Sequence, residues 1–167
     1  AEPGKYTYAS SGIGGSQHLV TALFLARSRA EALHVPFQGS APAIAALLGG
    51  QVDFGFDTPA AAAGLVRDGS LRALGVSVAR STTVAPGVPP IATAANLPEF
   101  DVGGWLGLAA PAATPRPILE RLSAEATAIA SSAVLRERLA AIHTEVEVRD
   151  AAAFTALLRD QRRVFGA

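Results

Sequence analysis

The sequence has no cysteine, so disulfides and a thiol nucleophile are both excluded, although the redox compartment stays open. It has three histidines, His18, His34 and His143, whose wide separation disfavours a zinc site. No apolar run reaches the roughly 18 residues expected of a membrane-spanning helix. The sequence has no excess of positive or negative charge, since 14 basic residues balance 14 acidic ones. This balance argues against a nucleic-acid partner, which needs a basic face.

What the sequence does have is apolar content, with half of its 167 residues hydrophobic. That length and composition suit one domain or two small lobes with an ample core. The first five residues, Ala-Glu-Pro-Gly-Lys, lack the form of a signal peptide.

One small-residue turn, residues 10–16, stands out near the start of the sequence. An alternating apolar run containing Tyr6 and Tyr8 enters this turn, and a long apolar segment leaves it, which predicts strand, turn and helix. Its glycines allow positive φ and close approach of the backbone to a ligand. We expect Ser16 to cap the helix, whose free N–H groups and positive dipole end then face the turn. Such a turn suits a carboxylate or a phosphate, although tight turns are rich in Gly and Ser for purely structural reasons too.

Two enzyme or cofactor motifs nearly match this turn and fail. The dinucleotide motif G-x-G-x-x-G is met at Gly12 and Gly14, but its third glycine falls on Gln17. The nucleophile motif G-x-S-x-G is met at Gly14 and Ser16, but its last glycine falls on His18. The turn therefore favours anion binding without attached chemistry.

The next residues continue as alternating strands and helices. We expect strands over residues 33–37, 52–56 and 71–78, and helices over 16–29, from about 40 to 48, and from 59 to about 68. Strand and helix thus alternate four times with short connections, which predicts an α/β fold with a parallel sheet. Ligands of such sheets bind outside the carboxyl ends of the strands. The loops there are small and polar, at residues 10–16, 37–40, 57–58 and 79–82, and their convergence strengthens the binding hypothesis.

The remaining residues predict mainly helices. We expect helices over 93–96, 115–131 and 133–141 and a last one capped by Asp150, with strands over 100–108 and 145–148. Trp105, beside two glycines, is typical of a packing residue where a chain crosses between lobes.

A series of phrases in this sequence resembles the Bug-type solute receptors of tripartite tricarboxylate transporters. The phrases are Ser-Ser-Gly-Ile-Gly-Gly-Ser-Gln-His (10–18), His-Val-Pro-Phe-Gln-Gly-Ser-Ala-Pro (34–42), Leu-Gly-Gly-Gln-Val-Asp (48–53), Leu-Arg-Ala-Leu-Gly-Val (71–76) and Trp-Leu-Gly-Leu-Ala-Ala-Pro (105–111). They occur in unbroken order over nearly the whole chain.

The resemblance implies a fold like that of type II periplasmic binding proteins, in which two α/β lobes close over a small organic acid for delivery to a membrane transporter. It implies a periplasmic protein that is not an enzyme and needs no cofactor or metal. Its implied partners are a small carboxylate, such as an organic acid or acidic amino acid, and the transporter subunits. The ligand-binding residues it implies are Ser10, Ser11, Gly12, Gly14, Gly15, Ser16, His18, Phe37, Gln38, Gly39 and Asp57.

Two departures from the family pattern bear on these expectations. Phe37-Gln38-Gly39 stands where the family commonly has Tyr-Lys-Gly, so a hydroxyl and a positive charge are missing from that loop. The family also carries a substantial segment before the stretch matching Tyr6. We therefore expect residues 5–101 to form one complete ligand-binding lobe and 102–167 the returning part of a truncated second lobe. The C-terminal helices would then expose an apolar face, which a homodimer, strand exchange or packing on the first lobe could cover.

Two other functions remain open from the residues. A hydrolase or phosphate-handling enzyme could use Ser11, Ser16 and His18, although the spacing suggests no acid–base partner for either serine. Alternatively, the chain could be an interaction or sensor-partner module that has lost transport function.

Three further residues have structural interpretations. Asp57 could contact a ligand or only cap the following helix. His34 and His143 are interpreted as structural.

Overall fold

The computed structural model describes residues 4–79 and 85–166. The chain divides into two compact units, with the division between Gly104 and Trp105.

A three-stranded parallel sheet forms the centre of the N-terminal unit. Its strands are β1 (Tyr6–Ser10), β2 (Ala32–Pro36) and β3 (Phe54–Gly55), in the order β2-β1-β3. Tyr8 pairs with His34 on one side and with Phe54 on the other. The last three residues of β1 are all buried, as expected of a central strand covered on both faces.

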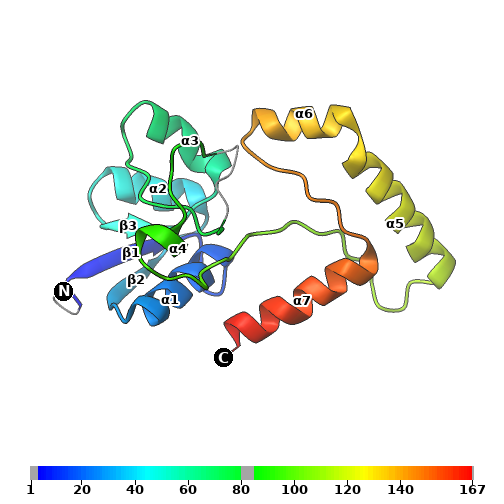
Figure 1. The fold of residues 1–167 in the computed structure, drawn as a ribbon, viewed down its shortest axis with the longest axis horizontal. Coiled ribbons are helices and arrows are strands. Elements are labelled where there is room, and N and C mark those ends of the chain that lie inside the picture. The colour runs from blue at the N-terminus through cyan, green and yellow to red at the C-terminus, as the bar shows by residue number, and fades with distance from the viewer. Residues whose placement is uncertain (1–3, 80–84, 167) are drawn as a thin grey trace. The chain divides into compact units, whose positions relative to one another are not determined.

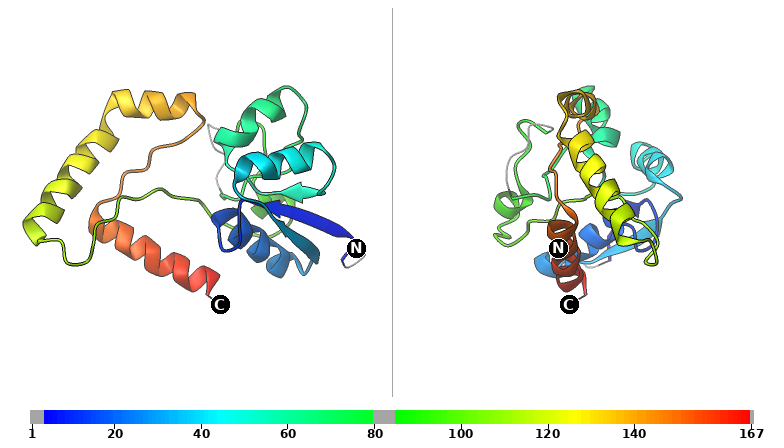
Figure 2. Two further views of the ribbon diagram at one scale, coloured as in Figure 1. Left: turned by 180° about the vertical axis from the view of Figure 1, so that it is seen from behind. Right: turned by 90° about the vertical axis from the view of Figure 1, so that its right-hand side faces the viewer.

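Helices cover both faces of this sheet (Figures 1 and 2). Helix α1 (Ser16–Ser28) connects β1 to β2, and α2 (Ser40–Leu48) connects β2 to β3. The two crossovers run in opposite directions over the sheet, so right-handed connections place the two helices on opposite faces. α3 (Pro59–Arg67) follows β3, and a short α4 (Ile91–Ala94) comes later. The core between α2 and β1 consists of small side chains, Ala9, Ala43, Ala46 and Val52, which allow a close approach.

The predicted starts of the helices are partly wrong. Gly15, not Ser16, is the N-cap of α1, and no side chain caps that helix. The Ser16 hydroxyl instead donates to Gln17 Oε1 at 3.2 Å. Thr58 is the N-cap of α3, with Pro59 as its first residue, as predicted, but the Thr58 side chain makes no cap bond. Asp57 accepts the N–H of Thr58, one residue on, rather than the N–H groups inside the helix that a cap satisfies.

The predicted strand over residues 71–78 does not form. Only an isolated bridge occurs there, between Val76 and Pro90. Proline has no N–H to donate, so a ladder cannot continue through Pro89 and Pro90. The bridge nevertheless brings Gly75 against Ile91, where a Cβ on Gly75 would lie 2.7 Å from Ile91 Cγ1. The fourth predicted ligand loop, residues 79–82, lies outside the described residues beyond Ala79.

Three helices make up most of the C-terminal unit, and all were predicted. They are α5 (Arg116–Ser131), α6 (Ala133–Ala141) and α7 (Ala151–Phe165). Asp150 caps α7 as expected, since its Oδ1 accepts the N–H of Ala153 at 2.8 Å. None of the described helices is long and apolar enough to cross a membrane.

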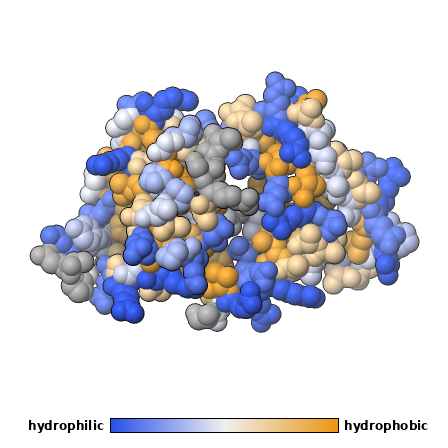
Figure 3. Space-filling view, viewed as in Figure 1, coloured by the Kyte–Doolittle hydropathy of each residue, from blue (hydrophilic) through white to orange (hydrophobic). Residues whose placement is uncertain are grey.

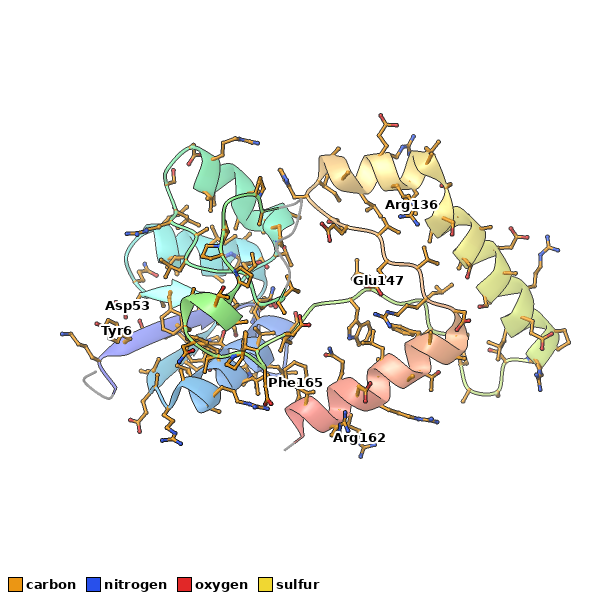
Figure 4. The ribbon with its side chains drawn as sticks, viewed as in Figure 1. Tyr6, Asp53, Arg136, Glu147, Arg162 and Phe165 are labelled. Carbon is orange, nitrogen blue, oxygen red and sulfur yellow. The ribbon has the colours of Figure 1, made fainter. Side chains whose placement is uncertain are left out.

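The strands predicted at 100–108 and 145–148 are absent. Both stretches have the right residue pattern, but no described strand lies beside them to complete a ladder. At Val146 the backbone is instead held by a side chain. Arg136 Nη1 donates to the carbonyl of Val146 at 3.2 Å, and Arg136 is labelled on α6 in Figure 4.

The C-terminal unit has no buried residue among its described residues, 105–166. Trp105, which is 47% exposed, packs edge-on against Phe154 with ring centroids 5.0 Å apart. Many large apolar side chains stay open to solvent, as expected from the sequence, and hydrophobic residues are visible across the surface in Figure 3. They include Leu106, Leu108, Ile118, Leu119, Leu122, Ile129, Val134 and Ile142.

The close approach of Gly75 to Ile91 predicts opposite effects for two glycine-to-alanine changes. Gly75→Ala should lower the free energy of unfolding by about 1–3 kcal/mol, because the new methyl overpacks Ile91. Gly64→Ala, inside α3 with nothing within 4 Å of the new methyl, should raise stability by roughly 0.5–1 kcal/mol. Urea denaturation of both variants would measure the difference. Equal stabilities would contradict the packing described at Gly75.

Candidate functional site

Two loops lie side by side at the carboxyl edge of the sheet. Residues 10–16 leave β1, and residues 37–39 leave β2. The N–H of Phe37 donates to the carbonyl of Ser10 at 2.9 Å, and the N–H of Gly39 donates to the carbonyl of Ser11 at 3.1 Å. The parallel pairing of β1 with β2 therefore continues past both strands and joins the two loops.

The first loop depends on glycines with positive φ. Gly12 has a φ of 142° and Gly14 a φ of 77°, values that residues with a Cβ rarely adopt. The N–H of Gly14 donates to His18 Nδ1 at 3.0 Å. A neutral His18 with this bond carries its proton on Nε2. The loop thus folds back onto the first turn of α1, where the first N–H groups of the helix have no intrahelical acceptor.

A chain of polar side chains connects this loop to the other strand ends. The hydroxyls of Ser11 and Ser16 both donate to Gln17 Oε1, at 2.6 and 3.2 Å. Gln17 Nε2 donates to Ser40 Oγ at 3.3 Å, on the first residue of α2. Ser40 Oγ in turn donates to Asp57 Oδ1 at 2.9 Å, just after β3. Residues from the ends of all three strands thus form one network.

Three aromatic rings stack beneath the loop. His18 and His34 are nearly parallel, with centroids 4.1 Å apart, and Tyr8 stacks on His34 at 4.7 Å. His34 Nε2 lies 2.6 Å from Ser10 Oγ. Burial lowers the pKa of His34, and the neighbouring His18 lowers it further, because two adjacent imidazolium charges repel. Burial also raises the pKa of Tyr8. The stack therefore favours a neutral His34 and a neutral Tyr8.

The geometry provides hydrogen-bond donors rather than a reactive centre. Ser10 and His34 have the separation of a nucleophile and its base, but Ser10 is only 1% exposed and cannot meet a substrate. Ser11 and Ser16 are directed at an amide, which is no base. Among the described residues there is no cluster of three or more acidic, histidine or cysteine side chains that could hold a metal.

Most of the residues predicted for the site lie together. The exception is Gln38, an exposed residue whose side chain takes part in none of the hydrogen bonds described here. The predicted residues that the contacts above join or adjoin are Ser10, Ser11, Gly12, Gly14, Gly15, Ser16, His18, Phe37, Gly39 and Asp57. Gly15 adjoins Ser11, since a Cβ on it would lie 3.6 Å from Ser11 Oγ.

Sequence reasoning missed three residues of the site: Gln17, Ser40 and His34. Gln17 was noted only as the position where a glycine motif failed. Ser40 was noted only as the last residue of the predicted loop 37–40 and as a possible start of a helix. His34 was interpreted as structural, and its contact with Ser10 supports the loop from below. The alternation of the strand could have placed His34 beside Tyr8, but the partner strand had to be known first.

The sequence matches, over residues 1–167, the family described as the tripartite tricarboxylate transporter family receptor. A protein of Pseudomonas sp. strain P51, described as a UPF0065 protein in the tcbD–tcbE intergenic region, is 46% identical over 123 residues. Those residues are 74% of this chain and 37% of that protein.

Solved structures match the fold over almost the whole chain. MatC from Rhodopseudomonas palustris with bound malate is 30% identical, with a TM-score of 0.85 over 98% of this chain and 56% of that one. The R. palustris protein Rpa4515 with adipate is 27% identical, with a TM-score of 0.84 over 99% and 57%. The chain therefore spans little more than half of these proteins, and less of the Pseudomonas relative.

The lowered pKa of His34 predicts a stability loss on mild acidification. Unfolding frees His34 to take up a proton at its ordinary pKa of about 6.5, whereas the folded protein resists protonation. The stability that neutral His34 contributes is thus present above that pKa and declines as the pH falls below it. The thermal midpoint, measured by circular dichroism at pH 7.5 and 5.5, should fall less in His34→Phe than in the wild type. An identical fall of the thermal midpoint in both proteins would show that His34 is not the source of the acid sensitivity.

Proposed function

Because the chain belongs to the receptor family of tripartite tricarboxylate transporters, we propose that it binds a small carboxylate at the loop of residues 10–16. The observation that carries this proposal is the joining of the loops after β1, β2 and β3 at one edge of the sheet. Ligands of parallel sheets bind at that edge.

The predicted resemblance to Bug-type receptors is confirmed by the family match and by the likeness to the solved periplasmic binding protein BugD. The predicted α/β fold with a parallel sheet is confirmed as well. The family consists of solute-binding receptors rather than enzymes, so the prediction of a non-catalytic protein is confirmed at the level of the family. The hydrolase hypothesis is not retained.

Neutral donors can hold the ligand carboxylate. The loops at residues 10–16, 37–39 and 57–58 contain no lysine or arginine. Instead, α1 directs its first N–H groups and the positive end of its dipole at the loop. Positive-φ glycines leave the backbone open, since a Cβ on Gly14 or Gly39 would meet nothing within 4 Å. Several neutral donors aimed at one anion replace a buried cation.

The chemical class of the ligand is proposed from two relatives. MatC carries malate and Rpa4515 carries adipate, and both molecules are dicarboxylates. We therefore propose a small dicarboxylic acid or an acidic amino acid, with one carboxylate on the loop of residues 10–16. Phe37 places an apolar ring in the adjoining loop, which suits a ligand with a hydrocarbon segment.

Location and partners are proposed on the same basis. The family acts with tripartite transporters, and BugD is a periplasmic binding protein. A periplasmic location, with delivery of the solute to membrane transporter subunits, follows for this chain by analogy. Residues 5–101 would serve as a complete ligand-binding lobe and 102–167 as part of a second lobe.

A second candidate function rests on the exposed apolar side chains of the C-terminal unit. Patches of this kind mark interaction surfaces. The chain could thus be an interaction or sensor-partner module, or could form a homodimer, with or without strand exchange, through this unit.

The ligand proposal predicts calorimetric binding of malate or adipate that depends on the loop backbone. Gly14→Ala should weaken binding at least about tenfold, because a Cβ strains the positive φ at that position. Gly64→Ala, in α3, serves as the matched control and should bind like the wild type. Equal affinities for both variants would remove the loop from the site, and no binding by the wild type would contradict the ligand class.

The second candidate predicts self-association. Light scattering after size-exclusion chromatography should give twice the mass of the chain, and Leu122→Glu on the exposed side of α5 should shift the protein towards the monomer. Glu120→Gln on the same helix is the control, because its side chain is charged and exposed already. A monomeric wild type would exclude a homodimer.

A further inference from the structure

Among the hydrogen bonds of the described residues, Gln17 is the only side chain that contacts Ser11 and Ser16 and also reaches the loop after another strand. Its carbonyl oxygen accepts from Ser11 at 2.6 Å and from Ser16 at 3.2 Å, and its amide donates to Ser40 at 3.3 Å. It is half-buried in the first turn of α1, a rigid base for these contacts.

We propose that Gln17 is the positioning residue of the carboxylate site, holding the Ser11–Ser16 loop, the start of α2 and Asp57 in one binding-ready arrangement. This inference rests on the function proposed above and adds a residue that the sequence did not indicate. Gln17 acts through its neighbours and need not touch the ligand itself.

The proton count of the serines supports a positioning role. A hydroxyl has one proton to donate, and both Ser11 and Ser16 direct theirs at Gln17 Oε1. The serines are therefore held in fixed orientations, and the first N–H groups of α1, which have no intrahelical acceptor, remain as donors to an anion. A ligand that displaced Gln17 would break three hydrogen bonds at once.

The other end of Gln17 is anchored as well. Ser40 Oγ accepts a hydrogen bond from the Gln17 amide and donates one to Asp57 Oδ1, which also accepts the N–H of Thr58 at 2.7 Å. The amide of Gln17 offers an acceptor to the serines and a donor to Ser40 from one side chain. Glutamate would keep the acceptor, lose the donor and place a negative charge in an anion site.

The first test measures the affinity of the whole chain for malate and adipate by calorimetry. Gln17→Leu keeps much of the side-chain bulk but has no polar group, and it should bind about tenfold more weakly because the loops lose their fixed orientation. Gln51→Leu, at an exposed glutamine in the turn after α2, is the matched control and should bind like the wild type.

A double-mutant cycle separates positioning from general damage. Ser40→Ala should weaken binding less than Gln17→Leu, and the double variant should be no weaker than Gln17→Leu alone, because both changes break the same connection. Independent, additive losses would show that Gln17 and Ser40 do not act through one network and would overturn the inference.

Amide hydrogen exchange without ligand gives a readout that does not depend on the ligand class. The N–H of Gly39, bonded to the carbonyl of Ser11, and that of Thr58, bonded to Asp57, should exchange faster in Gln17→Leu than in Gln51→Leu. Unchanged exchange at both amides would overturn the inference.

The outcomes distinguish this inference from the proposed function. If the wild type binds and Gln17→Leu binds equally well or more tightly, Gln17 is neutral or competes with the ligand, so the inference is wrong and the function stands. If the wild type binds neither acid, the proposed ligand class is wrong, and the exchange rates alone decide whether Gln17 holds the loops together.

Discussion

The pairing of β1 with strands on both of its sides is the interaction on which the candidate site depends. Parallel register brings the carboxyl ends of β1, β2 and β3 to one edge, and two backbone hydrogen bonds extend the β1–β2 pairing into the loops. The small core residues beneath α2 let that helix sit close to β1, so that Ser40 comes within reach of Gln17. Donors from distant parts of the sequence meet because one central strand organises them.

Local patterns predicted the helices well and the sheet only in part. The periodicity of α5 and α6 and the capping aspartate before α7 are features of consecutive residues, so no tertiary information was needed. A strand needs a neighbour as well as a pattern. Residues 71–78 have the apolar composition of a central strand, but their neighbour contains Pro89 and Pro90, which reduce the pairing to a single bridge.

The same distinction, between a pattern of consecutive residues and a contact between distant ones, explains which residues of the candidate site could be predicted. The glycines and serines of the first loop form a recognisable sequence motif, and the structure joins that loop to residues near Phe37 and Asp57. Gln17, by contrast, is one of several polar residues in α1 and has no local signature. Its importance lies in contacts with residues far along the chain, such as Ser40. Ser16 was assigned to a cap because its type suits one, but Gly15 occupies the N-cap position, and the Ser16 hydroxyl donates to Gln17 Oε1.

The C-terminal unit, which buries none of its described residues, affects how the whole chain responds to temperature. The heat-capacity change of unfolding arises mainly from apolar surface that becomes hydrated, and side chains that are already hydrated in the native state add little to it. The curvature of the stability curve is therefore set mainly by the residues packed around β1. Since the side chains of α5, α6 and α7 are at most half-buried, these helices contribute less heat capacity per residue, and the heat-capacity change of unfolding should be smaller than the chain length alone would give.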